Sequence, residues 1–175
     1  MDLQNQVSRI ELLLLDVDGV LTDGSIVYTD GGEELKRFHV RDGAGLKLWR
    51  LAGMRAAIVS GRASAAVSRR AAELGIEPVL QGRDDKSAAL DEVLAVTGLT
   101  ADRVAAIGDD LPDLPVLTRC GVAIAVADAC EEVRAAADRV TITPGGHGAV
   151  REAVEWLLRL QGRWGPLTAR YRPAG

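Results

Sequence analysis

Short apolar runs alternate with helical patterns along most of this chain. Ile10–Leu15 is apolar except for Glu11, and such a run is typical of a strand buried on both faces of a sheet. The alternation predicts an α/β fold of three layers, a doubly wound parallel sheet with helices on both faces. Strands are expected at Ile10–Leu15, Arg55–Ser60, Pro78–Gln81, Arg103–Gly108, Val122–Val126 and Arg139–Ile142, and helices at Gly45–Leu51, Ala63–Leu74, Lys86–Thr97, Leu114–Thr118, Glu131–Ala137 and Gly148–Gln161.

The segment 24–40 departs from this rhythm. Two strand-like runs, Ser25–Tyr28 and Glu34–Phe38, flank the pair Asp30-Gly31. An Asp-Gly pair between such runs is a strong signal for a β-hairpin. We expect a small hairpin inserted after the first strand, serving either as a surface decoration or as a lid or oligomer contact.

The length of the chain, 175 residues, favours a single domain. We expect that domain at 8–161, without a large cap domain, followed by a C-terminal tail at 162–175 that is rich in Gly, Pro and Arg. A net charge of −4 and 3% aromatic residues disfavour nucleic-acid binding. No apolar run approaches the roughly 20 residues of a membrane span. Cys120 and Cys130 lack metal or disulfide spacing, which favours a reducing cytoplasm.

Two acidic clusters follow predicted strands. Asp16 and Asp18 come directly after the first strand, and Asp109, Asp110 and Asp113 follow the fourth. Open α/β sheets bind ligands beyond the carboxyl ends of their strands, so we expect these side chains to meet. One acid of the second cluster is expected to cap a helix, but three exceed what capping requires. Together the clusters indicate a hard divalent cation, Mg²⁺, beside a substrate phosphate.

Two other strand ends supply groups that bind phosphate. Ser60, Gly61 and Arg62 offer a hydroxyl, a flexible backbone and a guanidinium. Lys86 lies in the first turn of a predicted helix, where a cation opposes the helix dipole unless an anion is near. Simpler interpretations remain open, with Ser60 as a helix cap and Lys86 as a solvated surface lysine.

The order of these motifs, DxDG, SG, K and GDDxxD, resembles the haloacid dehalogenase superfamily of phosphohydrolases. The resemblance covers about residues 8–161. It is sharpest to the family of 3-deoxy-D-manno-octulosonate 8-phosphate phosphatases, which act in lipopolysaccharide sugar synthesis. Closely similar phosphatases act on nine-carbon sugar-acid 9-phosphates. The stretches that carry the resemblance are DVDGVLTDG, GEELKRFHVRDG, SGR, GDDLPDLPV, AVADA and GGHGAVRE.

The resemblance implies a Mg²⁺-dependent phosphomonoesterase that works in two steps. Asp16 is expected to attack phosphorus and form an aspartyl-phosphate, while Asp18 acts first as acid and then as base. Mg²⁺ is expected on the Asp16 carboxylate, the Asp18 backbone carbonyl and Asp109. Asp110 and Asp113 are expected to support the metal's water ligands and the phosphate-binding lysine.

The resemblance also implies how the substrate is held. Ser60, Gly61 and Lys86 are expected to bind the phosphoryl group. Arg62 and His147 are candidates for contacts with the sugar acid. Many family members carry Arg or Lys at the position of His147, so its contact with a substrate carboxylate is expected to depend on pH.

Assembly and alternative functions complete the expectations. The family resemblance implies a homotetramer in which the hairpins pack together and a neighbouring subunit closes each site. The main alternative is a phosphatase for a nine-carbon sugar-acid 9-phosphate. A non-enzymatic phospho-Asp receiver domain is disfavoured, because receivers carry their phosphorylated Asp before the Lys, whereas GDDxxD follows it here. A catalytically inactive subunit is disfavoured because no residue of the constellation is missing.

Overall fold

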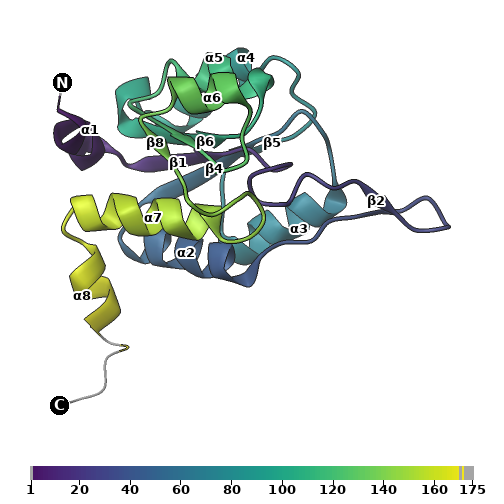
Figure 1. The fold of residues 1–175 in the computed structure, drawn as a ribbon, viewed down its shortest axis with the longest axis horizontal. Coiled ribbons are helices and arrows are strands. Elements are labelled where there is room, and N and C mark those ends of the chain that lie inside the picture. The colour runs from purple at the N-terminus through teal and green to yellow at the C-terminus, as the bar shows by residue number, and fades with distance from the viewer. Residues whose placement is uncertain (1, 170, 172–175) are drawn as a thin grey trace.

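A six-stranded parallel sheet forms the centre of the computed structural model, which describes residues 2–169 and 171 (Figure 1). The strand order is β5-β4-β1-β6-β7-β8, so the chain builds outward from the central β1 to one edge and then to the other. This is the expected doubly wound sheet, and the predicted fold class is confirmed. The strands are β1 (Leu12–Leu15), β4 (Arg55–Val59), β5 (Val79–Leu80), β6 (Val104–Gly108), β7 (Val122–Ala125) and β8 (Arg139–Val140).

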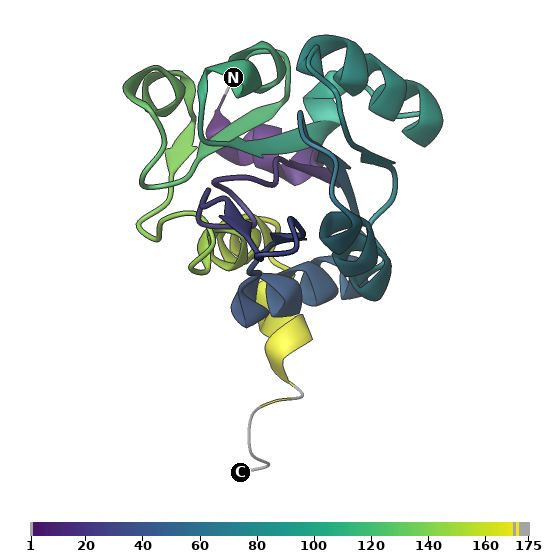
Figure 2. The ribbon, with the colours of Figure 1, turned by 90° about the vertical axis from the view of Figure 1, so that its right-hand side faces the viewer.

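Helices cover both faces of the sheet. Figures 1 and 2 show α2 and α7 on one side and α4 and α6 on the other. Every residue of β1, β6 and β7 is buried, which explains why these strands are continuous apolar runs. Within the described part of the chain, no helix has the length and apolar character to cross a membrane. The helices are α1 (Leu3–Arg9), α2 (Val40–Leu51), α3 (Ala65–Leu74), α4 (Lys86–Thr97), α5 (Leu114–Leu117), α6 (Glu131–Ala136), α7 (Ala149–Leu160) and α8 (Trp164–Ala169), with short 3₁₀ turns at Ala101–Arg103 and Leu111–Asp113.

Helix α2 begins at Val40, earlier than the expected start at Gly45. His39 precedes the helix and accepts a hydrogen bond from the backbone of Arg41 at 3.3 Å. Gly45 has low helix propensity, but its lack of a side chain lets α7 approach. A β-carbon at Gly45 would lie 3.0 Å from the Cα of Arg151. Packing between two helices therefore overrides the local signal.

Two helices at the ends of the chain have no counterpart in the sequence prediction. Helix α1 precedes the first strand, and α8 lies in the segment expected to be an irregular tail. Trp164 anchors α8, because the guanidinium groups of Arg151 and Arg159 each lie 5.2 Å from its ring centroid. Residues 170 and 172–175 of the predicted tail lie outside the described residues.

The predicted hairpin is present and projects from the body of the molecule (Figure 1). Strands β2 (Val27–Tyr28) and β3 (Glu34–Leu35) pair antiparallel, with Val27 opposite Leu35. The side chains of its strands divide between two environments. Several apolar ones face solvent, whereas the charged ones at its base turn toward the end of β1, as described below.

Candidate active site

The three neighbouring strands β1, β4 and β6 end at the same edge of the sheet. Leu15 pairs with Ile58 on one side and with Ile107 on the other. Asp16 therefore emerges beside the residues that follow β4 and β6. Its backbone N–H donates to the Ile107 carbonyl at 3.2 Å, which fixes the turn out of β1. This edge is also the point where the strand order reverses, the usual ligand site of an open α/β sheet.

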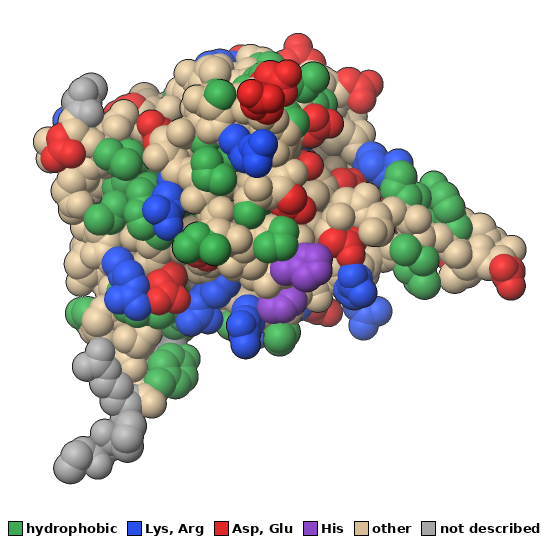
Figure 3. Space-filling view, viewed as in Figure 1, with side chains coloured by type: hydrophobic (Ala, Val, Ile, Leu, Met, Phe, Trp, Pro, Cys, Tyr) green, Lys and Arg blue, Asp and Glu red, His purple; other side chains and the backbone are tan. Residues whose placement is uncertain are grey.

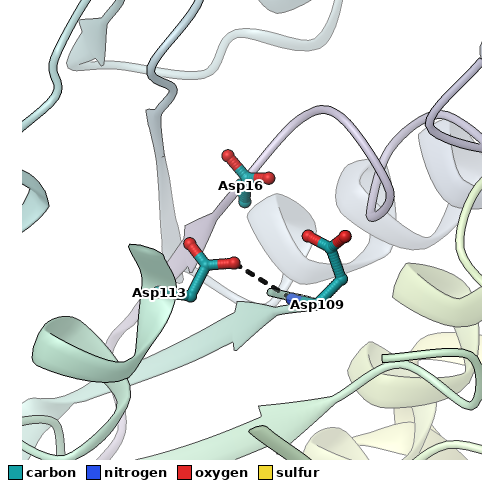
Figure 4. Close-up of side chains that lie close together, drawn as sticks. All are labelled: Asp16, Asp109 and Asp113. Carbon is teal, nitrogen blue, oxygen red and sulfur yellow. Dashed lines mark hydrogen bonds between the residues drawn. The ribbon is translucent and has the colours of Figure 1, made fainter. Parts of the chain in front are cut away.

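Three carboxylates converge at this edge (Figure 4). Oxygen atoms of Asp16, Asp109 and Asp113 all lie within 4.8 Å of one another. Asp113 is held by backbone groups, since its Oδ2 accepts from the N–H of Asp109 at 3.0 Å and of Asp110 at 3.4 Å. The predicted meeting of the two acidic clusters is thus seen in the structure for these three side chains.

Burial makes this cluster costly in its ionised form. Burial, and next the charge of Asp113, raise the pKa of Asp16 to about 6, although Lys86 opposes the shift. Burial is also the largest cause of the raised pKa of Asp109, about 8, followed by repulsion from Asp16 and Asp113. Two carboxyl groups in one site therefore hold their protons far more tightly than usual.

Lys86 is the cation that contacts the cluster of Asp16, Asp109 and Asp113. Its Nζ lies 2.8 Å from Asp16 Oδ1 and 2.5 Å from Asp113 Oδ1. Burial lowers the pKa of Lys86, but the neighbouring Asp16 and Asp113 charges outweigh burial and raise it. At 8% exposure Lys86 is not a solvated surface lysine. Asp85 caps helix α4 by accepting from Ala88 N–H at 3.0 Å, which fixes the helix turn that carries the lysine.

The donor set fits Mg²⁺. Ionised Asp16, Asp109 and Asp113 with protonated Lys86 leave two negative charges without a counter-ion. Carboxylate oxygens are the ligands that Mg²⁺ prefers, and a divalent cation would relieve the repulsion that raises both pKa values. The loop after β1 is tight here, because a β-carbon at Gly19, whose φ is +89°, would collide with the Asp109 carboxylate. The expected cofactor is thus supported by charge and by donor chemistry.

The Asp18 carboxylate points toward other partners. Its Oδ1 contacts the ammonium of Lys36, and its Oδ2 lies 3.7 Å from Arg62 Nε. Arg62 Nη2 also binds Glu34 Oε1 at 2.6 Å, and this hydrogen bond is the largest cause of the lowered pKa of Glu34. Sequence reasoning missed Glu34 and Lys36. Their spacing of two residues on a strand was the available signal, because it places both side chains on one face.

Nine of the ten predicted site residues line one cavity of about 280 Å³. Ser60 is 2% exposed and does not cap a helix, since α3 begins only at Ala65. The cavity is lined by Asp16, Asp18, Ser60, Gly61, Arg62, Lys86, Asp109, Asp110, Pro112 and Asp113.

The structure does not bring His147 to this cavity. Its Nδ1 lies 2.7 Å from the Gly145 carbonyl, which holds the ring over its own turn. It lines a second cavity of about 510 Å³ together with Arg41 and Arg139. The loop that carries His147 nevertheless contacts the loop that follows β1, because Gly146 N–H donates to the Val20 carbonyl at 2.9 Å.

Known proteins resemble the chain over nearly its whole length. A family model for haloacid dehalogenase-like hydrolases matches residues 79–152. The 3-deoxy-D-manno-octulosonate 8-phosphate phosphatase KdsC of Haemophilus influenzae is 44% identical over 161 residues, which cover 92% of this chain and 89% of the relative.

Solved structures agree in fold. A Moraxella catarrhalis 3-deoxy-D-manno-octulosonate 8-phosphate phosphatase, in complex with magnesium, phosphate and a KDO molecule, superposes with a TM-score of 0.95 at 42% identity, covering 98% of each chain. A cobalt-bound phosphatase of the same type from Haemophilus influenzae gives a TM-score of 0.88 at 43% identity, covering 91% of this chain and 94% of that one. The chain therefore belongs to the 3-deoxy-D-manno-octulosonate 8-phosphate phosphatases, a family of haloacid dehalogenase-like phosphoric monoester hydrolases.

Proposed function

We propose that this protein hydrolyses 3-deoxy-D-manno-octulosonate 8-phosphate to the free sugar acid and inorganic phosphate. The observation that carries the proposal is the largely buried group of Asp16, Lys86, Asp109 and Asp113 at the sheet edge, in a chain 44% identical to a phosphatase named for that substrate. Phosphate monoesters resist hydrolysis so strongly that enzymes accelerate it up to about 10²¹-fold. A site with a nucleophile, an acid, a metal and phosphate-binding groups meets that demand.

In the first step Asp16 attacks phosphorus. A bond forms between phosphorus and an Asp16 carboxylate oxygen, and the bond between phosphorus and the sugar oxygen breaks. The carboxyl proton of Asp18 passes to the sugar oxygen, which leaves as a hydroxyl. Lys86 and Ser60 bind phosphoryl oxygens, where negative charge spreads as the bonds change.

In the second step water replaces the enzyme on phosphorus. Asp18, now a carboxylate, takes a proton from water as the water oxygen bonds to phosphorus. The bond between phosphorus and Asp16 breaks, and inorganic phosphate is released. Lys86, which contacts Asp16 at 2.8 Å, is the counter-ion of the restored carboxylate.

We assign the metal to the Asp16 carboxylate, the backbone carbonyl of Asp18 and the Asp109 carboxylate. Bound Mg²⁺ supplies positive charge that lets an anionic nucleophile and an anionic phosphate approach each other. The Asp113 carboxylate binds Lys86 and a backbone N–H group. We therefore assign it to holding Lys86 in place rather than to direct coordination of the metal. Asp110 would support the water ligands of the bound metal.

Arg62 is our first candidate for recognition of the sugar acid. It lines the catalytic cavity, and its side chain is 43% exposed at the opening. A guanidinium binds a carboxylate with two parallel hydrogen bonds, which suits the acid group of the substrate. His147 is a weaker candidate in a single chain, because it lines the neighbouring cavity.

We further propose that the chain works as a cytoplasmic homotetramer held together through its hairpins. Figure 3 shows apolar side chains along the projecting hairpin. Val27 is 48% exposed and its cross-strand partner Leu35 is 52% exposed, on a segment too small to bury them itself. Replacing both, Val27→Asp with Leu35→Asp, should lower the mass measured by light scattering. An unchanged mass would contradict the proposed interface.

The proposed reaction is tested by phosphate release from matched substrates. The purified protein with Mg²⁺ is offered 3-deoxy-D-manno-octulosonate 8-phosphate and a nine-carbon sugar-acid 9-phosphate in parallel. The proposal expects a higher kcat/KM for the eight-carbon substrate and no turnover by Asp16→Asn. Preference for the nine-carbon substrate would select the alternative phosphatase, and one phosphate retained per chain without turnover would select a receiver domain.

A further inference from the structure

One charged side chain of the hairpin reaches the active site without a role in the mechanism above. The ammonium of Lys36 contacts Asp18 Oδ1, and the Lys36 side chain is only 2% exposed. Its neighbour Leu35 points outward and is 52% exposed. The hairpin base therefore directs a buried cation at the residue proposed as acid and base.

The contacts around Lys36 close into a ring of four charges. Lys36 contacts Asp18 and lies 3.5 Å from Glu34 Oε1. Arg62 binds the same Glu34 oxygen at 2.6 Å and lies 3.7 Å from the other oxygen of Asp18. Each carboxylate thus lies beside two cations, and each cation lies beside two carboxylates. Such a ring fixes direction as well as distance, since a rotation of Asp18 would break contacts on both sides.

We propose that Lys36 is a positioning residue for Asp18. By holding Oδ1, it leaves Oδ2, which Arg62 Nε approaches only to 3.7 Å, as the oxygen that faces the leaving oxygen of the substrate. This inference rests on the proposed role of Asp18 as acid and base. During the first step the Oδ2 proton passes to the sugar oxygen, and the electron pair of the broken O–H bond stays on Asp18. The ammonium stabilises the negative charge that appears there and keeps its own protons throughout.

A purely structural ion pair explains the geometry less well. A buried salt bridge adds little net stability, because desolvation offsets most of the attraction. Lys36 also belongs to a hairpin whose strands are two residues each and largely exposed, so that the inward side chains of Lys36 and Glu34 are exceptions. The partner it contacts is the acidic residue two positions after Asp16, in the loop that forms the catalytic cavity.

The test compares two leaving groups in single-turnover experiments with enzyme in excess. The sugar oxygen of 3-deoxy-D-manno-octulosonate 8-phosphate needs a proton to leave, whereas the nitrophenolate of 4-nitrophenyl phosphate does not. Lys36→Met removes the charge and keeps the apolar stem. It should slow release of the sugar roughly 30- to 100-fold, up to the lower end of the roughly 10²- to 10⁴-fold that general acid catalysis contributes, because the acid itself remains; release of nitrophenolate should slow less than about threefold. Lys36→Arg should recover most of the loss.

Control variants distinguish the role of Lys36 from the role of Asp18 and from the general effect of removing a lysine. Lys47→Met, on the exposed face of α2, should behave as the unmodified protein. Asp18→Asn should show the same dependence on the leaving group as Lys36→Met. If Asp18→Asn retains full activity with the sugar phosphate, the proposed reaction mechanism is wrong. If Asp18→Asn shows the dependence and Lys36→Met does not, only the role of Lys36 is overturned.

Three other outcomes would overturn the role of Lys36. Equal losses with both substrates would show a structural effect. A higher enzyme concentration at half-saturation, with an unchanged maximal single-turnover rate, would show that Lys36 binds substrate directly. Failure of Lys36→Met and Lys36→Gln to fold, judged by far-ultraviolet circular dichroism, would show that the ion pair serves the fold.

Discussion

Replacing Asp109 by Asn should stabilise the metal-free protein at pH 8. The three clustered carboxylates of Asp16, Asp109 and Asp113 face one lysine, Lys86, and burial with repulsion raises the pKa of Asp109 to about 8. An acid whose pKa is higher in the folded state binds its proton more tightly there than in the unfolded chain. Its stabilising contribution is complete at pH below the unfolded value and is lost as the pH rises through about 8. Asn has nearly the same shape and carries no charge to repel.

The size of the effect follows from the two pKa values. A rise from 3.8 to about 8 corresponds to an upper bound of about 5 kcal/mol at pH 8. Asp109 is partly exposed, so solvent screens its charge. It also repels Asp16, and a proton on either carboxyl group relieves that repulsion. Both effects reduce the free-energy difference below this upper bound. We expect Asp109→Asn to gain about 2 kcal/mol, or roughly 4–8 °C in Tm for a domain of this size.

Thermal unfolding followed by circular dichroism measures this shift in protein stripped with EDTA. The gain of Asp109→Asn should be larger at pH 8 than at pH 5, and Mg²⁺ should raise the Tm of the unmodified protein more than that of the variant. Asp102→Asn, an exposed acid outside the site, is the matched control and should change little. A lower Tm for metal-free Asp109→Asn at pH 8 would show that charge repulsion at Asp109 does not destabilise the metal-free protein.

Three further predictions concern the same site. Lys86→Met leaves Asp16 and Asp113 without their cation, and urea unfolding should show that the free energy of unfolding falls by about 3 kcal/mol. An unchanged free energy would show that the two carboxyl groups are not both ionised beside Lys86. Gly19→Ala should weaken Mg²⁺ affinity at least tenfold by calorimetry, because the added methyl displaces the Asp109 carboxylate; equal affinity would show that the loop yields freely. Removing Mg²⁺ with EDTA should abolish phosphate release and adding it back should restore release, whereas full activity in EDTA would contradict the metal assignment.

Much of the fold could be predicted from the sequence because the sheet is buried on both faces. Strands such as Leu12–Leu15 have no polar face, so they are visible as unbroken apolar runs. The start of α2 was not visible, since its glycines reduce the local helix signal and are accommodated by packing of Gly43 against α3 and of Gly45 against α7. Helix α8 depends on Trp164 meeting two arginines of α7, a contact between segments that the local pattern does not encode.

The candidate site divides in the same way. The positions of Asp16, Ser60 and Asp109 could be predicted from the sequence. Each directly follows a strand, and neighbouring parallel strands end at the same edge of the sheet. The contact of Lys36 with Asp18 could not be predicted. A hairpin pattern predicts that its two strands pair with each other, but it does not predict how the base of the hairpin is oriented relative to the sheet. His147 shows the converse limit. Its motif placed it near the site, but a hydrogen bond to Gly145 directs the ring to a separate cavity.

In the proposed mechanism, Asp16 carries the phosphoryl group between the two steps. Borohydride reduces an acyl phosphate on aspartate to the alcohol homoserine. The protein is therefore mixed with 3-deoxy-D-manno-octulosonate 8-phosphate and Mg²⁺, quenched during turnover, reduced and digested for mass spectrometry. The proposed mechanism predicts homoserine at position 16 and at no other aspartate position. Rapid turnover without homoserine at position 16, or with homoserine at Asp18 or Asp109, would contradict it.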